Sequence, residues 1–183
     1  MKKIYIAYGA NTNREAMKRR CPKAEIIGTG YGFIDGYKFK FNNVADIVRT
    51  TDEEKRSKKF FDAPAIAWRI TPECEESLDR FEGFPSLYRK IDVNFTPAGE
   101  ENSWKGFAYK MNYEGFHTPS PSYVNTIRVG LKDFFHPLYW ETIDHSIDSA
   151  IVKSFRMEER GAPFTSRRTI SSMRNTVGGS QWR

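Results

Sequence analysis

The stretch Ile4-Tyr5-Ile6-Ala7-Tyr8-Gly9-Ala10-Asn11-Thr12-Asn13 joins a short apolar strand to the start of a helix. Residues 4–8 are mainly β-branched or aromatic, which is typical of a buried strand. Thr12 has capping-box spacing to Glu15, and Asn13 is an alternative N-cap. At such a junction several backbone N–H groups point to one place, so the turn is a candidate site for a carboxylate or a phosphate. Many strand–helix turns use these residues for structure alone, so the turn by itself does not assign a function.

Composition indicates one folded domain with a substantial core. The 183 residues are 39% hydrophobic and 15% aromatic, which excludes a disordered chain. No apolar run approaches the roughly 20 residues that span a bilayer. The segment after Met1 resembles the start of a signal peptide, but Asn11 and Arg14 end it early and no small-residue cleavage site follows. We therefore expect a cytoplasmic protein without a membrane partner.

Cysteines and histidines are too few, and too poorly spaced, to predict a metal site. The chain has Cys21, Cys74, His117, His136 and His145, with no zinc-binding pattern and no spacing that favours a disulfide. The glycines form no GxGxxG that opens a helix, so a dinucleotide site has no support either. The sequence therefore predicts neither a metal nor a cofactor.

The positive charge is concentrated at the C-terminal end. Residues 150–183 contain seven Lys or Arg residues and two Glu residues, a net charge of +5, whereas residues 1–149 carry only +1. We interpret 150–183 as a basic tail, flexible or docked on a partner, and 1–149 as the folded domain. Nucleic-acid contact is expected of the tail alone, and the alternative that we favour is a solvated tail.

The periodicity predicts an α+β domain rather than alternating βαβ units. Glycine-punctuated strands over 24–41 are expected to bend, which helps a sheet curl into a barrel. The charged run 50–59 is predicted to be a surface loop. Further strands are predicted at 44–48, 63–70, 88–96 and 104–111, and helices at 71–83, after Ser120 and near Pro137. The helix after Ser120 has an apolar face of Tyr123, Ile127, Leu131 and Phe134, and the helix near Pro137 is predicted to turn Ile143 and Ile147 inward.

The helix at 71–83 has the clearest boundaries. Thr71 is its predicted N-cap, Pro72 its first residue, and Gly83 follows its end. Its apolar face contains Cys74, Leu78 and Phe81.

Glu82 lies within that apolar sector, about 40° from Leu78 at 100° per residue. Desolvation and the negative helix C-terminus would both raise the pKa of such a carboxyl group, toward the range that suits proton transfer. The alternative is a carboxylate that reaches solvent or an arginine. Glu82 is therefore a candidate acid–base residue.

Two stretches together resemble the gamma-glutamyl cyclotransferase-like family. Tyr8-Gly9-Ala10-Asn11, followed by Arg20-Cys21-Pro22, resembles the substrate loop of that family. Leu78-Asp79-Arg80-Phe81-Glu82-Gly83-Phe84-Pro85, with Tyr88, resembles its catalytic segment. Two more features match, Trp68 and Pro119-Ser120-Pro121-Ser122-Tyr123, so the resemblance runs from about residue 4 to residue 135.

The resemblance implies a small curled β-barrel with flanking helices and one polar cavity. It also implies release of 5-oxoproline, in which the α-amine of a γ-glutamyl compound attacks its own γ-carbonyl and expels an amine. This chemistry needs no cofactor because the nucleophile is intramolecular. Glu82 would be the base and then the acid. The residues that would bind substrate are Tyr8, Gly9, Ala10, Asn11, Thr12, Tyr88 and Tyr123, with the amides of 9–12 holding the α-carboxylate or the oxyanion.

The loop departs from the family pattern at two positions. Ala10 stands where serine is usual, and Thr12 stands where leucine is usual. The loss of one hydroxyl removes a possible side-chain donor but leaves the backbone donors in place. An alternative hypothesis follows from Ala10 and the tail, namely a non-catalytic ligand-binding or adaptor protein that uses its basic tail for a partner.

Overall fold

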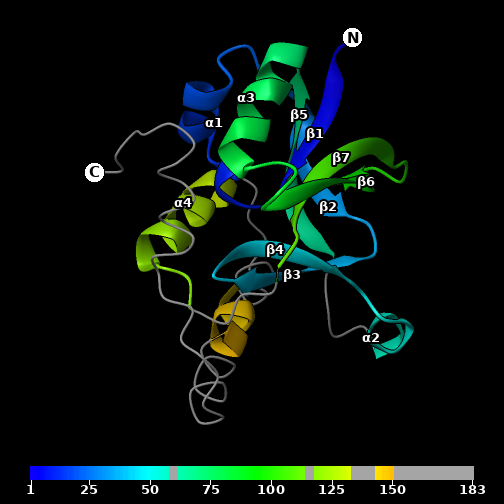
Figure 1. Cartoon of the computed structure of the whole chain (residues 1–183). Coiled ribbons are helices and arrows are strands. Elements are labelled where there is room, and N and C mark those ends of the chain that lie inside the picture. The colour runs from blue at the N-terminus through cyan, green and yellow to red at the C-terminus, as the bar shows by residue number, and fades with distance from the viewer. Residues whose placement is uncertain (58–61, 114–117, 133–142, 151–183) are drawn as a thin grey trace.

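Five strands form a closed barrel in the computed structural model, which describes residues 1–57, 62–113, 118–132 and 143–150 (Figure 1). Their spatial order is β1-β5-β2-β6-β7, and β1 closes the barrel by pairing in parallel with β7. The predicted curled barrel with flanking helices is therefore confirmed. The bounds of the five strands are β1 Lys3–Ala7, β2 Glu25–Ile34, β5 Ala63–Ile70, β6 Tyr88–Pro97 and β7 Trp104–Met111.

The bend in β2 lets the barrel close. Its pairing with β5 shifts register between Ile26 and Tyr31. Gly28 and Gly30 lie inside that interval with φ of 58° and 86°, a region that residues with a Cβ rarely adopt. The glycine-marked bend predicted from the sequence is thus present as an irregularity in the pairing of β2 with β5.

A hairpin packs beside the barrel. It consists of β3 (Tyr37–Asn42) and β4 (Val44–Arg49), and its Phe39 and Ile47 are buried. Lys110 on β7 joins the hairpin to the barrel, since its Nζ donates to Ile47 O at 2.6 Å and contacts the buried Asp46 carboxylate at 3.2 Å. This attachment fixes β4 at the edge of the site described below.

Helix boundaries follow the predicted capping residues. Helix α3 (Pro72–Glu82) starts at the Thr71 N-cap and ends at Gly83, and α4 (Pro121–Leu131) starts at the Ser120 N-cap. Helix α1 (Arg14–Arg20) follows the 3₁₀ turn η1 (Ala10–Thr12). Its N-cap is the alternative residue, Asn13, whose side chain accepts from Ala16 N at 3.0 Å.

The predicted surface loop at 50–59 is wrong in part, because residues 52–57 form helix α2 (Asp52–Ser57). A capping box explains the helix: Thr51 N donates to the Glu54 carboxylate at 2.9 Å, and Glu54 N donates to Thr51 Oγ1 at 3.2 Å. Acidic residues also occupy its first turn and basic residues its last, which suits the helix dipole. Figure 1 shows α2 apart from α1, α3 and α4.

Several predictions concern residues outside the described part of the chain. These are the start of the helix near Pro137, the inward position of Phe134, and the part of the predicted tail 150–183 that begins at residue 151. Residues 143–150 are helical, with Ile143 fully buried and Ile147 packed on the core, as predicted. Among the helices that the structure describes, none is long and apolar enough to cross a membrane.

Candidate functional site

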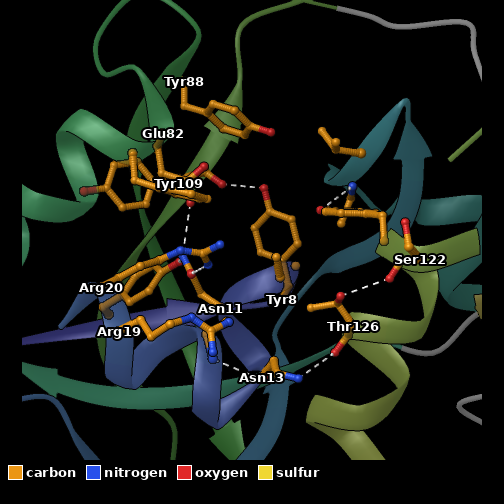
Figure 2. A pocket seen from close by; sticks show the side chains of 18 of the residues that line it. Tyr8, Asn11, Asn13, Arg19, Arg20, Glu82, Tyr88, Tyr109, Ser122 and Thr126 are labelled. Atoms are coloured by element: carbon orange, nitrogen blue, oxygen red, sulfur yellow. Dashed lines mark hydrogen bonds between the residues drawn. The ribbon is translucent and has the colours of Figure 1, made fainter. Parts of the chain in front are cut away.

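One pocket of about 470 Å³ collects nearly all of the predicted site residues (Figure 2). Its walls come from η1, α1, the end of α3, the starts of β4 and β6, α4, and one tyrosine each of β1 and β7. Seven of the eight candidates line it: Tyr8, Gly9, Ala10, Asn11, Glu82, Tyr88 and Tyr123. The eighth, Thr12, is fully buried and is absent from the pocket wall.

Asn11 connects the turn to α3. Its side-chain Nδ2 donates to Glu82 Oε1 at 3.0 Å and to the Tyr5 hydroxyl at 2.8 Å, while its Oδ1 accepts from Arg20. Its backbone carbonyl accepts from the Trp68 indole N–H at 3.1 Å. Asn11 is only 2% exposed. Because a guanidinium can only donate, Arg20 fixes the orientation of the amide so that Nδ2 faces Glu82.

The 3₁₀ turn presents backbone donors to the pocket. Its first internal hydrogen bond runs from Thr12 N to Gly9 O at 3.0 Å, so the amides of Ala10 and Asn11 precede the internal bonding of the turn. Thr12 Oγ1 also donates to Gly9 O, at 2.8 Å, so the Thr12 side chain braces the turn from behind. The sequence predicted the amides of residues 9–12 as donors for a carboxylate or an oxyanion. The Thr12 amide is bonded within the turn, whereas those of Ala10 and Asn11 precede its internal bonding.

Close packing against α4 holds this turn in place. A Cβ added at Gly130 would lie 2.5 Å from the Thr12 carbonyl carbon, so only glycine allows α4 to approach so closely. The hydroxyl of Tyr123, in the first turn of α4, accepts from Ala45 N at 3.1 Å. It also lies over Gly9, where an added Cβ would be 3.2 Å away. Tyr123 therefore ties α4 to β4 across the turn.

Glu82 is the last residue of α3 and is half-buried. Leu78, one turn earlier, is fully buried, which fixes the rotation of the helix and directs Glu82 to the pocket. The Arg20 guanidinium stacks 3.6 Å from the centre of the neighbouring Phe81 ring. Burial lowers the pKa of Arg20, and the Glu82 charge opposes that shift, so the two charges stabilise one another.

Buried tyrosines line the same pocket. Burial raises the pKa of Tyr8 and of Tyr5 well above the usual phenol value, and nearby carboxylates add to both shifts. The Tyr8 hydroxyl donates to Tyr109 O, and the Tyr109 hydroxyl donates to Asp79 Oδ1 at 2.6 Å. Burial and that bond raise the pKa of Tyr109 too. These phenols therefore stay neutral near pH 7 and orient neighbouring groups by hydrogen bonding.

Comparisons with known proteins agree on the fold. No protein-family model matches the sequence, and no curated protein matches it. A solved structure named gamma-glutamyl cyclotransferase matches with a TM-score of 0.65 at 19% identity, over 96% of this chain and 99% of that chain. The chain has the gamma-glutamyl cyclotransferase-like fold. An uncharacterized protein from Homo sapiens matches with a TM-score of 0.64 at 24% identity, over 76% of this chain and 83% of that chain. The protein YkqA from Bacillus subtilis matches with a TM-score of 0.62 at 18% identity, over 81% of this chain but only 55% of its own.

Within this gamma-glutamyl cyclotransferase-like fold, the sequence did not reveal several lining residues. The sequence pattern assigns Tyr5 and Tyr109 to strands and Arg20 to the end of a helix, yet all three line the pocket. Arg19 and Thr126 also line the pocket. A signal for Arg20 was available, since it lies nine residues after Asn11 and directly before Cys21-Pro22, within the segment that resembles the family.

Proposed function

We propose that this protein is a cofactor-free γ-glutamyl cyclotransferase, an acyl-transfer enzyme that releases 5-oxoproline and an amine from a γ-glutamyl compound. One observation carries the proposal. The Glu82 carboxylate and the amide end of η1 face one pocket, with Asn11 Nδ2 only 3.0 Å from Glu82 Oε1. A proton acceptor and oxyanion donors on one cavity are what intramolecular acyl transfer requires.

The proposed reaction begins with proton transfer. Glu82 takes a proton from the substrate α-ammonium, and the freed amine attacks the γ-carbonyl carbon to form the new C–N bond of a five-membered ring. The γ-carbonyl oxygen becomes an oxyanion in the tetrahedral intermediate. When the old C–N bond breaks, Glu82 gives this proton to the leaving nitrogen. It then takes the second proton from the ring nitrogen and passes it to the released amine or to solvent. The carboxyl group ends as it began, so the cycle consumes no co-reactant.

The surrounding residues supply orientation and charge stabilisation. The Ala10 and Asn11 amides are suited to the α-carboxylate or to the oxyanion, because both amides precede the internal bonding of the turn. Asn11 holds Glu82 in place, and Tyr8 and Tyr88 are buried beside it. Ala10 provides no side-chain hydroxyl, but backbone donors are independent of side-chain identity. The loop can therefore act with alanine at this position.

The test is release of 5-oxoproline by the purified full chain. A panel of γ-glutamyl amino acids and γ-glutamylamines is incubated with the protein, and 5-oxoproline is measured by mass spectrometry. We expect enzyme-dependent release from at least one of them without added metal. Saturable binding of these compounds with no turnover would contradict the proposal and would favour the second candidate, a non-catalytic ligand-binding protein, which the Ala10 substitution supports.

A further inference from the structure

The pocket has two chemically different ends. At the inner end Glu82, Tyr88 and Tyr8 lie on α3 and the barrel, and both tyrosines are buried. At the outer end lie polar residues of α1 and α4, and Asn13 Nδ2 bridges the two helices by donating to Thr126 O at 3.5 Å. Figure 2 shows Asn13 and Thr126 across Tyr8 and Asn11 from Glu82 and Tyr88. A substrate whose γ-carbonyl lies near Glu82 would therefore extend toward this outer end, which forms the rim of the pocket.

The rim also carries a positive charge. Three charged residues among those described line the pocket, namely Arg19, Arg20 and Glu82. Arg20 is engaged with Asn11, Phe81 and the Glu82 charge. Arg19 is exposed in the last turn of α1, and within the described ranges it makes no ion pair. Burial lowers the pKa of Arg20 and the Arg19 charge adds to that shift, while the Glu82 charge opposes it more strongly than Arg19 adds to it. Glu82 therefore acts mainly on Arg20, and the two arginines and one glutamate give the pocket wall a net charge of +1.

We propose that Arg19 is a specificity-determining residue that binds a carboxylate on the leaving amine, so that the preferred substrates are γ-glutamyl amino acids rather than uncharged γ-glutamylamines. This inference rests on the proposed function. A guanidinium at a half-open rim binds a carboxylate through charge-assisted hydrogen bonds, whereas a neutral amine substituent gains nothing from it. The α-carboxylate of the glutamyl part is left to the amides of Ala10 and Asn11.

Two matched probes test the assignment. γ-Glutamyl-L-alanine and γ-glutamyl-L-alaninamide differ only in the group that Arg19 would contact, a carboxylate in the first and a carboxamide in the second. We expect the full chain to prefer the carboxylate by about 10-fold in kcat/KM, mostly through KM, because the contact persists from bound substrate to transition state. The same preference is expected in Kd, measured by calorimetry.

Substitution of the arginine should remove this preference selectively. In R19Q the preference is expected to fall to within about 2-fold, with the carboxamide probe little changed, and R19K is expected to retain part of it. The control is K18Q, an identical charge change at an exposed neighbour in α1 that does not line the pocket.

Each result decides between clear alternatives. An unchanged preference in R19Q, or an equal loss for both probes, would overturn the role of Arg19 while leaving the proposed function intact. The absence of turnover of either probe would count against the proposed function, and the Kd preference would then still support or overturn the assignment of Arg19. Failure of the full chain to bind either probe would overturn it.

Discussion

The two ends of α3 use their carboxylates differently. At the start of the helix, Glu75 is paired with Lys3 at 2.8 Å and with Lys90 at 2.6 Å. Asp79 is paired with the same Lys90 at 2.8 Å and accepts from the Tyr109 hydroxyl at 2.6 Å. At the end of the helix, Glu82 accepts from the neutral Asn11 amide and faces the pocket.

Glu75 and Asp79 therefore attach α3 to the barrel, whereas Glu82 is the carboxylate that is available to a substrate in the pocket. The lysine-paired carboxylates fasten α3 to β1, β6 and β7, and the pairs sit on the barrel rather than in the pocket wall. Tyr109 joins Asp79 to the pocket wall, because its hydroxyl bonds to Asp79 while its carbonyl accepts from Tyr8. The lysine pairs of Glu75 and Asp79 thus hold the helix that carries Glu82. Four substitutions can break or sharpen the comparison.

The largest effect on activity is expected for E82Q. The amide keeps the size of the side chain but cannot carry a proton between the two amines, so 5-oxoproline release should fall by about 100-fold to 10,000-fold. The free energy of unfolding should change by no more than about 1 kcal/mol, because Glu82 is only half-buried. The matched control is E75Q on the same helix, which should retain most of the activity. Equal losses in the two variants would erase the distinction between the ends of α3.

A smaller loss is expected for N11A. Without the amide, Glu82 and the buried Tyr5 hydroxyl lose their shared donor. We expect kcat to fall by about 10-fold to 100-fold, and the free energy of unfolding to fall by about 1–3 kcal/mol because buried polar groups lose partners. Steady-state kinetics and urea unfolding measure the two effects. A destabilised variant with unchanged kcat would reduce Asn11 to a structural residue.

The residues changed in these variants also show which features of the site can be predicted from the sequence. Thr71, Pro72 and Gly83 determine α3 locally, and the helical angle between Leu78 and Glu82 predicts an inward carboxylate. The contact between Asn11 and Glu82 joins residues 71 positions apart, so it depends on closure of the barrel. No local pattern in a single sequence contains that information.

Other departures have local causes. Helix α2 was not predicted because the run 50–59 has no apolar periodicity. Its capping box between Thr51 and Glu54 is nevertheless sufficient to start a helix. Thr12 reads as a pocket residue next to Asn11, yet the 3₁₀ turn rotates its side chain inward, onto Gly9 O. Backbone geometry within three residues decided that placement.

E75Q should show a pH-dependent loss of stability. Burial alone would raise the pKa of Glu75, but hydrogen bonds from Lys3 and Lys90 outweigh it and hold the pKa below its usual value. A lowered folded-state pKa stabilises the fold above the unfolded value of about 4.3, and the contribution is lost as pH falls through the folded value. We expect E75Q to lower the free energy of unfolding by about 1–2 kcal/mol at pH 7 and by less near pH 3. A deficit that is equal at both pH values would contradict the assigned pairing.

The smallest effect is expected for T51A, which removes the N-cap of α2. The capping bond is worth about 0.5–2 kcal/mol to the helix, and α2 contributes no residue to the pocket wall. Hydrogen exchange in residues 52–57 should accelerate, while 5-oxoproline release stays at the wild-type rate. A change in that rate would mean that α2 influences the site.

The most direct test of the account is a crystal structure of the full chain with 5-oxoproline bound. We predict that the product lies in the pocket, with its carboxylate or ring carbonyl on the amides of Ala10 and Asn11 and its ring nitrogen within hydrogen-bond distance of the Glu82 carboxyl. Product bound at any other place, or an empty pocket at concentrations that inhibit release, would contradict the claim that Glu82 and the turn act on one substrate.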